Sequence, residues 1–265
     1  DRLRGAWFPA VLGVALAVAV AFLTLPVVAI VAHAPPGELI ASLGDPSARE
    51  ALRLSALTTA IAALLVALVG TPAAYLLATR RFRGRALLVT LLELPLLLPP
   101  AVAGIGLLAA LGPRGLLGPG LDRLGIRLVL ETAGVVVALA FVSAPLYLGA
   151  ARSAFAAVDP GWREASRTLG ASEARTFARI AVPAALPGLA AGLALAWARA
   201  LGEFGATLLF AGAFRGVTET APLAIYARFA TDFDGALALS AVLVAAAGGL
   251  LLTAKLLGRG GVGWG

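Results

Sequence analysis

The sequence predicts an all-α membrane protein with about six transmembrane helices in a single domain, residues 1–265. Composition is the first reason, because 60% of the residues are hydrophobic and 13% are charged, against about 25% charged in soluble domains. Length is the second, since several apolar runs reach the ~20 residues that a helix needs to cross a bilayer. The third is arginine, which gathers between those runs, as is typical of membrane surfaces.

The apolar runs predict six spans in chain order: 7–32, 52–79, 86–111, 131–152, 184–212 and 236–257. The first run is too long for the core of a signal peptide and has no convincing cleavage site, so we expect a retained helix. Within the third run, the stretch ELPLLLPPAVAGIG (93–106) concentrates prolines beside Glu93. These prolines indicate either kinks that aid packing or a hinge or cavity lining, since neighbouring helices can satisfy the freed carbonyls.

Arginine and lysine predict the orientation of the spans, because cytoplasmic loops carry the excess of these residues. With both termini inside, the larger set lies on the cytoplasmic side: Arg2, Arg4, Arg80, Arg81, Arg83, Arg85, Arg152, Arg163, Arg167, Arg175, Arg179, Lys255 and Arg259. The smaller set lies outside: Arg49, Arg53, Arg114, Arg123, Arg127, Arg215 and Arg228. The segment 153–183, which we call the charged insert, is therefore expected in the cytoplasm.

Residue types disfavour three other functions. The chain has no Cys and a single His, His33, so a zinc site of Cys and His ligands is excluded, and no metal or other cofactor is expected. His33 follows an apolar run and is expected in an interfacial loop. The net charge of +7 is attributed to membrane orientation rather than to nucleic acid. Lys255, the only lysine, has no Walker A context, so we expect a chain that is not itself an ATP-hydrolysing enzyme.

The charged insert carries ordered start and stop signals for two helices. Asp159 is a good N-cap, and Pro160 follows at the first helical position, where its missing N–H costs nothing. The helix is expected to run to about Leu169, and Gly170 ends it because glycine takes the left-handed conformation cheaply. Ser172 can cap a second helix. The sequence therefore predicts helix, glycine turn and helix at the cytoplasmic face.

Three interpretations of the charged insert compete. It can be a solvated loop, a DNA-binding helix-turn-helix, or a docking site for a cytoplasmic protein that exerts force on the spans. The helix-turn-helix is disfavoured, since the neighbouring spans leave no third helix and no room to enter a groove. A first helix this short is not stable alone and needs a partner. Pro183 either ends the segment or kinks it into the next span.

The charged insert resembles the EAA loop of the membrane subunits of ABC importers. The family pattern is E-A-A, three residues, G, nine residues and I-x-L-P. This chain keeps every spacing, with Glu164-Ala165-Ser166, Gly170, Ile180 and Val182-Pro183. It departs from the pattern at Ser166, where Ala is usual, and at Val182, where Leu is usual. Both changes are small in size and shape.

The resemblance implies a type I ABC importer permease fold and a set of partners. In the family, this loop forms a coupling helix that sits in a groove of the ATP-binding subunit. The contact residues that it implies here are Glu164, Ala165, Ser166, Leu169 and Gly170. It further implies a second copy of the chain with the pore at the interface, two ATPase subunits below, a binding protein outside, and surrounding membrane lipid of the inner membrane.

Other stretches are similar to the molybdate/tungstate branch of that family, with the sulfate/thiosulfate branch close behind. These are WARALGEFGATLLFAG (197–212), TETAPLAIY (218–226) and ELPLLLPPAVAGIGLL (93–108). The likeness covers most of residues 50–257. Because sulfate permeases share much of ARALGEFGA, the segment 218–226 is what favours molybdate or tungstate as the implied cargo.

Arg199 and Glu203 are four residues apart in the predicted fifth span, so they share a helix face. They are expected either as a structural ion pair or as part of the translocation path, with Thr207 contributing a hydroxyl toward the outer mouth. An ion-driven secondary transporter would need a buried acidic relay, for which Glu93 and Glu203 are the candidates. An intramembrane enzyme would need a histidine or paired carboxylates within the spans, and neither is visible in the sequence.

Overall fold

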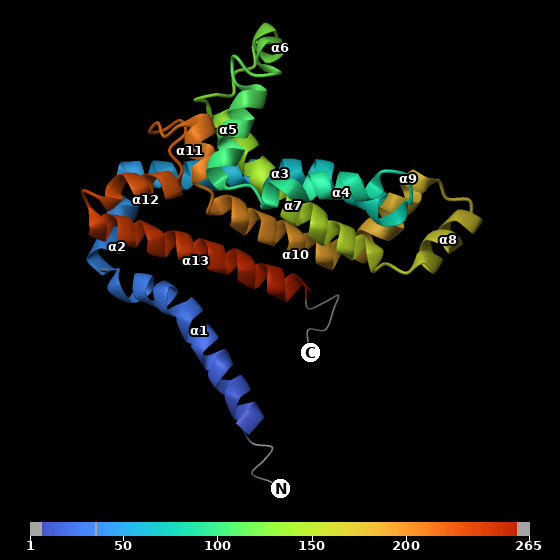
Figure 1. The fold of residues 1–265 in the computed structure, drawn as a ribbon, viewed down its shortest axis with the longest axis horizontal. Helices are drawn as coiled ribbons and strands as arrows, with labels where there is room; N and C mark the ends of the chain where they lie inside the picture. Colours follow the sequence, from blue (N-terminus) through green and yellow to red (C-terminus); the bar gives the residue numbers. More distant parts are fainter. Residues whose placement is uncertain (1–6, 35, 259–265) are drawn as a thin grey trace.

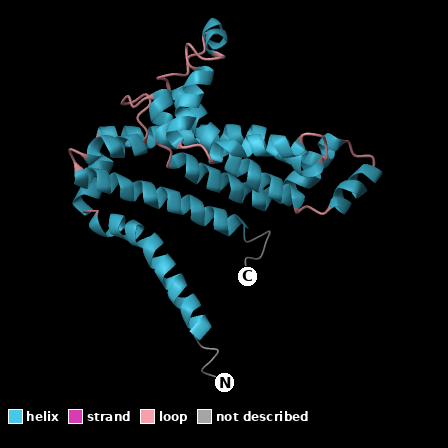
Figure 2. Cartoon of the chain, viewed as in Figure 1, coloured by secondary structure: helices cyan, strands magenta, loops and turns pink. Residues whose placement is uncertain are grey.

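The structure of the chain is a computed structural model that describes residues 7–34 and 36–258. Every element within these residues is helical, as Figure 2 shows. The all-α prediction is therefore confirmed. Arg2, Arg4 and Arg259, which enter the predicted charge bias, lie outside the described residues.

The helices follow one another along the chain with short connections (Figure 1). Their bounds are α1 Trp7–His33, α2 Pro36–Gly44, α3 Pro46–Thr79, α4 Arg85–Glu93, η1 Leu94–Leu96, α5 Pro100–Leu111, α6 Gly118–Arg123, α7 Thr132–Ala156, α8 Pro160–Thr168, α9 Glu173–Thr176, η2 Phe177–Ala181, α10 Val182–Leu201, α11 Gly205–Ala211, α12 Ala221–Phe229 and α13 Phe233–Gly258. Five stretches are long and apolar enough to span a membrane: Phe8–His33, Pro46–Thr79, Thr132–Ala156, Glu173–Leu201 and Phe233–Thr253.

The core is a bundle in which α7 lies between α3 and α10, and α13 packs on the other side of α10 (Figure 1). Small residues allow α7 and α10 to approach closely. A Cβ atom placed on Gly188 or Gly192 would lie 2.6 Å from the Cβ atom of Ala154 or Ala150, respectively. Such small-residue contacts are typical of helix pairs in membranes, where close backbone approach replaces the hydrophobic effect as the driving force.

The third predicted span, 86–111, is present as two helices rather than one. The stretches Arg85–Leu96 and Pro100–Leu111 meet at an angle of 114°. Pro95, Pro99 and Pro100 supply no N–H, so the backbone ladder cannot continue through them. The bend turns α5 away from the bundle and against α11, as Figure 1 shows. By length and composition, the described residues contain six stretches that could span a membrane if this bent pair counts as one.

The fifth predicted span, 184–212, is wrong at both ends. Its helical stretch begins earlier, at Glu173, and passes through the π-helical turn η2 into α10. Pro183 lies in the first turn of α10, and the wide π turn before it removes the clash that a proline ring makes with an α-helical carbonyl. The stretch stops at Leu201, and α11 begins separately at Gly205.

Candidate functional site

The first helix of the charged insert forms as the sequence predicts. The Asp159 carboxylate accepts a hydrogen bond of 2.8 Å from the backbone N–H of Gly161, and Pro160 stands at the first helical position. Helix α8 ends at Thr168, and Gly170 follows with a φ of +79°. This is the left-handed region that favours glycine. The predicted glycine stop is confirmed.

The second helix of the charged insert also begins at its predicted cap. The Ser172 side chain accepts a hydrogen bond of 3.3 Å from the backbone N–H of Arg175. Only one turn of α9 forms before the π turn of Phe177–Ala181. Single π turns inside helices are frequent at functional sites.

The predicted contact residues of the charged insert lie on an open helix. Glu164, Ala165, Leu169 and Gly170 are all exposed. Trp162 on α8 is 57% exposed and Leu169, directly after α8, is 88% exposed, so no described residue covers these two large apolar side chains. Ser166 instead faces the protein and lies 2.9 Å from the Thr176 hydroxyl. Exposed apolar groups on a polar helix are typical of a surface that binds another protein.

Arg199 and Glu203 form the ion pair that their spacing predicts. Arg199 Nη1 lies 2.7 Å from Glu203 Oε2, and the Glu203 side chain is only 2% exposed. The second carboxylate oxygen accepts a hydrogen bond of 2.9 Å from the backbone N–H of Ala206. Glu203 therefore connects the end of α10 to the first turn of α11.

Thr207 lies on α11, which packs against α5 and α7. Its side chain is fully buried, and its hydroxyl has no hydrogen-bond partner among the described residues. The structure thus places Thr207 in the interior of a single protomer, whereas Arg199 is about one-third exposed. The role of these three residues in a translocation path stays a prediction.

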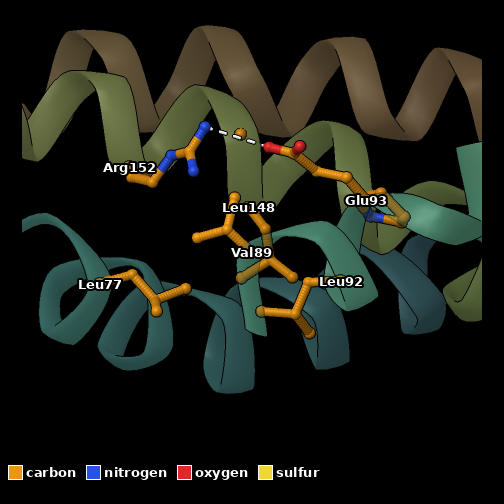
Figure 3. A pocket seen from close by; sticks show the side chains of 8 residues that line it. Leu77, Val89, Leu92, Glu93, Leu148 and Arg152 are labelled. Atoms are coloured by element: carbon orange, nitrogen blue, oxygen red, sulfur yellow. Dashed lines mark hydrogen bonds and ion pairs between the residues drawn. The ribbon is translucent and has the colours of Figure 1, made fainter. Parts of the chain in front are cut away.

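The ion pair between Glu93 and Arg152 was not predicted from the sequence. Arg152 Nη2 lies 3.0 Å from Glu93 Oε1, across a small cavity lined by Leu77, Val89 and Leu148 among others (Figure 3). Arg152 lies near the C-terminal end of α7, and its side chain points toward Glu93 at the end of α4. The available signal was Glu93 itself, since a carboxylate in an apolar run needs a partner.

The two carboxylates proposed for an acidic relay are on different helices, and each pairs with its own arginine. They do not form a relay with one another by any contact that the described residues make. Within the same residues, no group of three or more His, Asp or Glu side chains could hold a metal ion. Among the described residues, the charged insert thus offers one exposed helix, and Glu93 and Glu203 each form an ion pair at a helix break.

The chain is similar in sequence to membrane subunits of known transport systems. Residues 70–256 match the family described as the binding-protein-dependent transport system inner membrane component. The molybdenum transport system permease protein ModB of Mycobacterium tuberculosis is 43% identical over 251 residues, which cover 93% of this chain and 91% of that protein. ModB of Escherichia coli K12 is 41% identical over 82% of this chain and 96% of its own length. The sulfate transport system permease protein CysT of Escherichia coli K12 is 34% identical over 76% of this chain and 73% of its own length.

Comparison with solved structures supports the fold. A bacterial ABC transporter involved in the import of the acidic polysaccharide alginate has a TM-score of 0.75 at 17% identity, covering 98% of this chain and 99% of that one. The MetNI methionine ABC transporter in an inward-facing conformation has a TM-score of 0.59 at 16% identity, covering 79% and 94%. At these identities, the likeness establishes the arrangement of helices and nothing about cargo.

Proposed function

The chain belongs to the binding-protein-dependent transport system inner membrane component family, and from this premise we propose that it imports molybdate or tungstate as the membrane subunit of an ABC importer. The observation that supports this choice of cargo is the 43% identity to a molybdenum permease over 93% of the chain. A protein named as a molybdate/tungstate permease, WtpB of Pyrococcus abyssi, is also similar, at 39% identity over 65% of the chain. The bound anion is expected to be a tetrahedral oxyanion.

The energy for import comes from separate ATPase subunits, one for each of two copies of the chain. Helix α8 is the docking element, because Trp162 on it and Leu169 directly after it are exposed among the described residues, and because the helix ends in a defined glycine turn. ATP binding closes the two ATPases together and carries α8 with them, which opens the path to the outside. Hydrolysis restores the inward-open state. The cycle requires only that ATP binds the two states with different affinity.

The positive-inside rule favours an orientation with the charged insert in the cytoplasm. The family description favours the inner membrane as the location of the chain. Arg199 is the residue of the predicted path that remains partly accessible, at 36% exposure. Because its charge is already compensated by Glu203, it does not form a strong anion site. High affinity for the oxyanion is therefore assigned to an external binding protein, since tight binding in the path would slow release.

Sulfate or thiosulfate is the second candidate cargo. The observation that favours it is the 34% identity to a sulfate permease over 76% of this chain. This alternative changes only the transported anion, and the proposed coupling to the ATPase stays the same.

The decisive experiment reconstitutes the chain with its ATPase in liposomes and supplies the binding protein on the outside. ATP hydrolysis is recorded with molybdate, tungstate and sulfate in turn. Stimulation by low molybdate or tungstate, and not by sulfate, is the expected result. Stimulation by sulfate alone would replace the cargo and keep the importer. Failure of the ATPase to associate would refute the docking role of α8.

A further inference from the structure

Among the contacts that join the charged insert to the transmembrane bundle, one carboxylate, that of Glu173, is shared by two arginines. Both carboxylate oxygens of Glu173 lie 2.7 Å from Nη2 of Arg80, which is the C-cap residue directly after α3. The Nη2 atom of Arg167, on α8, lies 3.7 Å from the same carboxylate. Glu173 therefore stands between the exposed helix and the end of a long span that is 93 residues away in the chain.

Two further contacts hold the segment that follows Glu173 against α8 and α3. The hydroxyls of Ser166 on α8 and Thr176 on α9 lie 2.9 Å apart, and Thr176 is 1% exposed. The Phe177 ring, directly after α9, lies 4.9 Å from the ring of Tyr75 on α3. Helix α8, the turn at α9 and the C-terminal end of α3 are thus held to one another by side chains, in addition to the chain itself.

Helix α3 reaches from this contact to the opposite end of the protomer. It has 34 residues, which correspond to about 51 Å at 1.5 Å per residue. In the third turn of α3, the Ser55 hydroxyl accepts a hydrogen bond of 2.7 Å from the backbone N–H of Ala221, the first residue of α12. Asp45, the N-cap of α3, forms an ion pair with Arg228 of α12. A displacement of α3 would therefore also displace α12 through these two contacts.

The contact between Glu173 and Arg80 contributes little to stability, because both side chains are about half exposed and exposed ion pairs are screened by water and salt. Its geometry is nevertheless specific, with one guanidinium nitrogen shared by both carboxylate oxygens. A contact of this kind can set the position of α8 without being needed for folding.

We infer that Glu173 is a positioning residue that ties α8 to α3, so that a displacement of α8 by the ATPase moves α3 and, through it, α12. This inference rests on the proposed function, because it assumes that α8 is the element that an ATPase moves. It adds a second route for the force, beside the covalent routes from the charged insert into α7 and α10.

The test is a double-mutant cycle on the complete complex in liposomes, with Arg80→Gln, Glu173→Gln and the double variant. Arg83→Gln is the matched control, since Arg83 is in the same connection and makes no ion pair with any residue that the structure describes. The measured quantities are ATPase recovered with the permease and anion transported per ATP hydrolysed. Each single variant is expected to keep the ATPase and to lower transport per ATP by roughly fivefold.

In the double variant, transport per ATP is expected to be no lower than in the single variant with the lower value, because both substitutions remove the same contact. Wild-type transport per ATP in both single variants would overturn the inference, and so would losses that multiply in the double variant. If Glu173→Gln loses the ATPase altogether, Arg80→Gln decides alone, because Arg80 lies outside the charged insert. A wild-type complex that neither binds the ATPase nor transports would refute the proposed function itself, which is a separate outcome.

Discussion

The carboxylate of Glu203 joins two helices, because it lies 2.7 Å from Arg199 Nη1 on α10 and 2.9 Å from the backbone nitrogen of Ala206 on α11. The chain breaks between these helices, and the break leaves backbone N–H groups at the start of α11 without helical partners. A carboxylate that is 2% exposed is costly unless it is paired and hydrogen-bonded. Glu203 meets both requirements. Its carboxylate accepts from a free backbone N–H of α11, and the same hydrogen bond and the ion pair with Arg199 stabilise the buried charge.

This arrangement predicts an unequal effect of removing either partner. Arg199→Gln leaves the buried carboxylate without its counter-charge, and we expect it to lower the free energy of unfolding by about 3 kcal/mol. Glu203→Gln keeps an oxygen that can accept from Ala206, and it leaves a partly exposed arginine, so a loss of about 1 kcal/mol is expected. Thermal unfolding in detergent measures both. Arg127→Gln, at an exposed position, serves as control, and a larger loss in Glu203→Gln would contradict the interpretation.

The packing of α10 on α7 predicts the effect of a single methyl group. Gly192→Ala would place a Cβ atom 2.6 Å from the Cβ of Ala150, which requires the helices to move apart. We expect a loss of about 1–3 kcal/mol, as is usual for overpacking. Adding Ala150→Gly to the same protein should recover most of that loss. Gly149→Ala is the control, because nothing lies within 4 Å of a Cβ there, and it should be neutral or stabilising by up to about 1 kcal/mol. Failure of the paired substitution to recover stability would mean that another contact limits the helix approach.

The contact between Asp45 and Arg228 predicts a dependence of stability on pH. The hydrogen bond from Arg228 lowers the pKa of the Asp45 carboxyl, and backbone N–H groups of Ser47 and Ala48 add to it against an opposing effect of desolvation. Because the pKa is lower in the folded state, the contribution is complete above the unfolded value of about 3.9 and is lost as pH falls through the folded value. Asp45→Asn removes it at every pH.

The measurement is the unfolding midpoint of the wild type and of Asp45→Asn as pH is lowered. The difference between them is expected to be constant near neutrality and to shrink below a pH of about 4. Arg228→Gln should flatten the same part of the wild-type curve, since it removes the main cause of the lowered pKa. Parallel curves for the wild type and Asp45→Asn over the whole range would show that this carboxyl does not contribute.

Features that depend on neighbouring residues could be predicted from the sequence. The cap at Asp159, the stop at Gly170 and the cap at Ser172 each require only a few adjacent residues, and each appears at its predicted position. The pairing of Arg199 with Glu203 follows from a spacing of four residues. The EAA-type pattern is made of such local signals, which is why it indicated the family.

Features that depend on distant residues could not be predicted in the same way. The prolines of 93–106 indicated a disturbance, but the 114° bend depends on the docking of α5 against α11. The partner of Glu93 is 59 residues away in the chain, and the partner of Glu173 precedes it by 93. A hydropathy pattern carries no information about which helices are neighbours, so these contacts emerge only from the packed bundle.

The φ of +79° at Gly170 gives the sharpest prediction for the charged insert. Nothing lies within 4 Å of a Cβ placed there, so any cost of a substitution comes from the backbone and not from a clash. A β-branched residue resists the left-handed conformation by about 1–2 kcal/mol, whereas asparagine adopts it more readily. Gly170→Val should therefore reorient α8 and lose the ATPase, while Gly170→Asn keeps it. Both proteins should insert normally, which membrane fractionation checks. Equal recovery of the ATPase with both variants would show that the left-handed turn does not set the position of α8, whereas loss in both would mean that the glycine surface itself makes the contact.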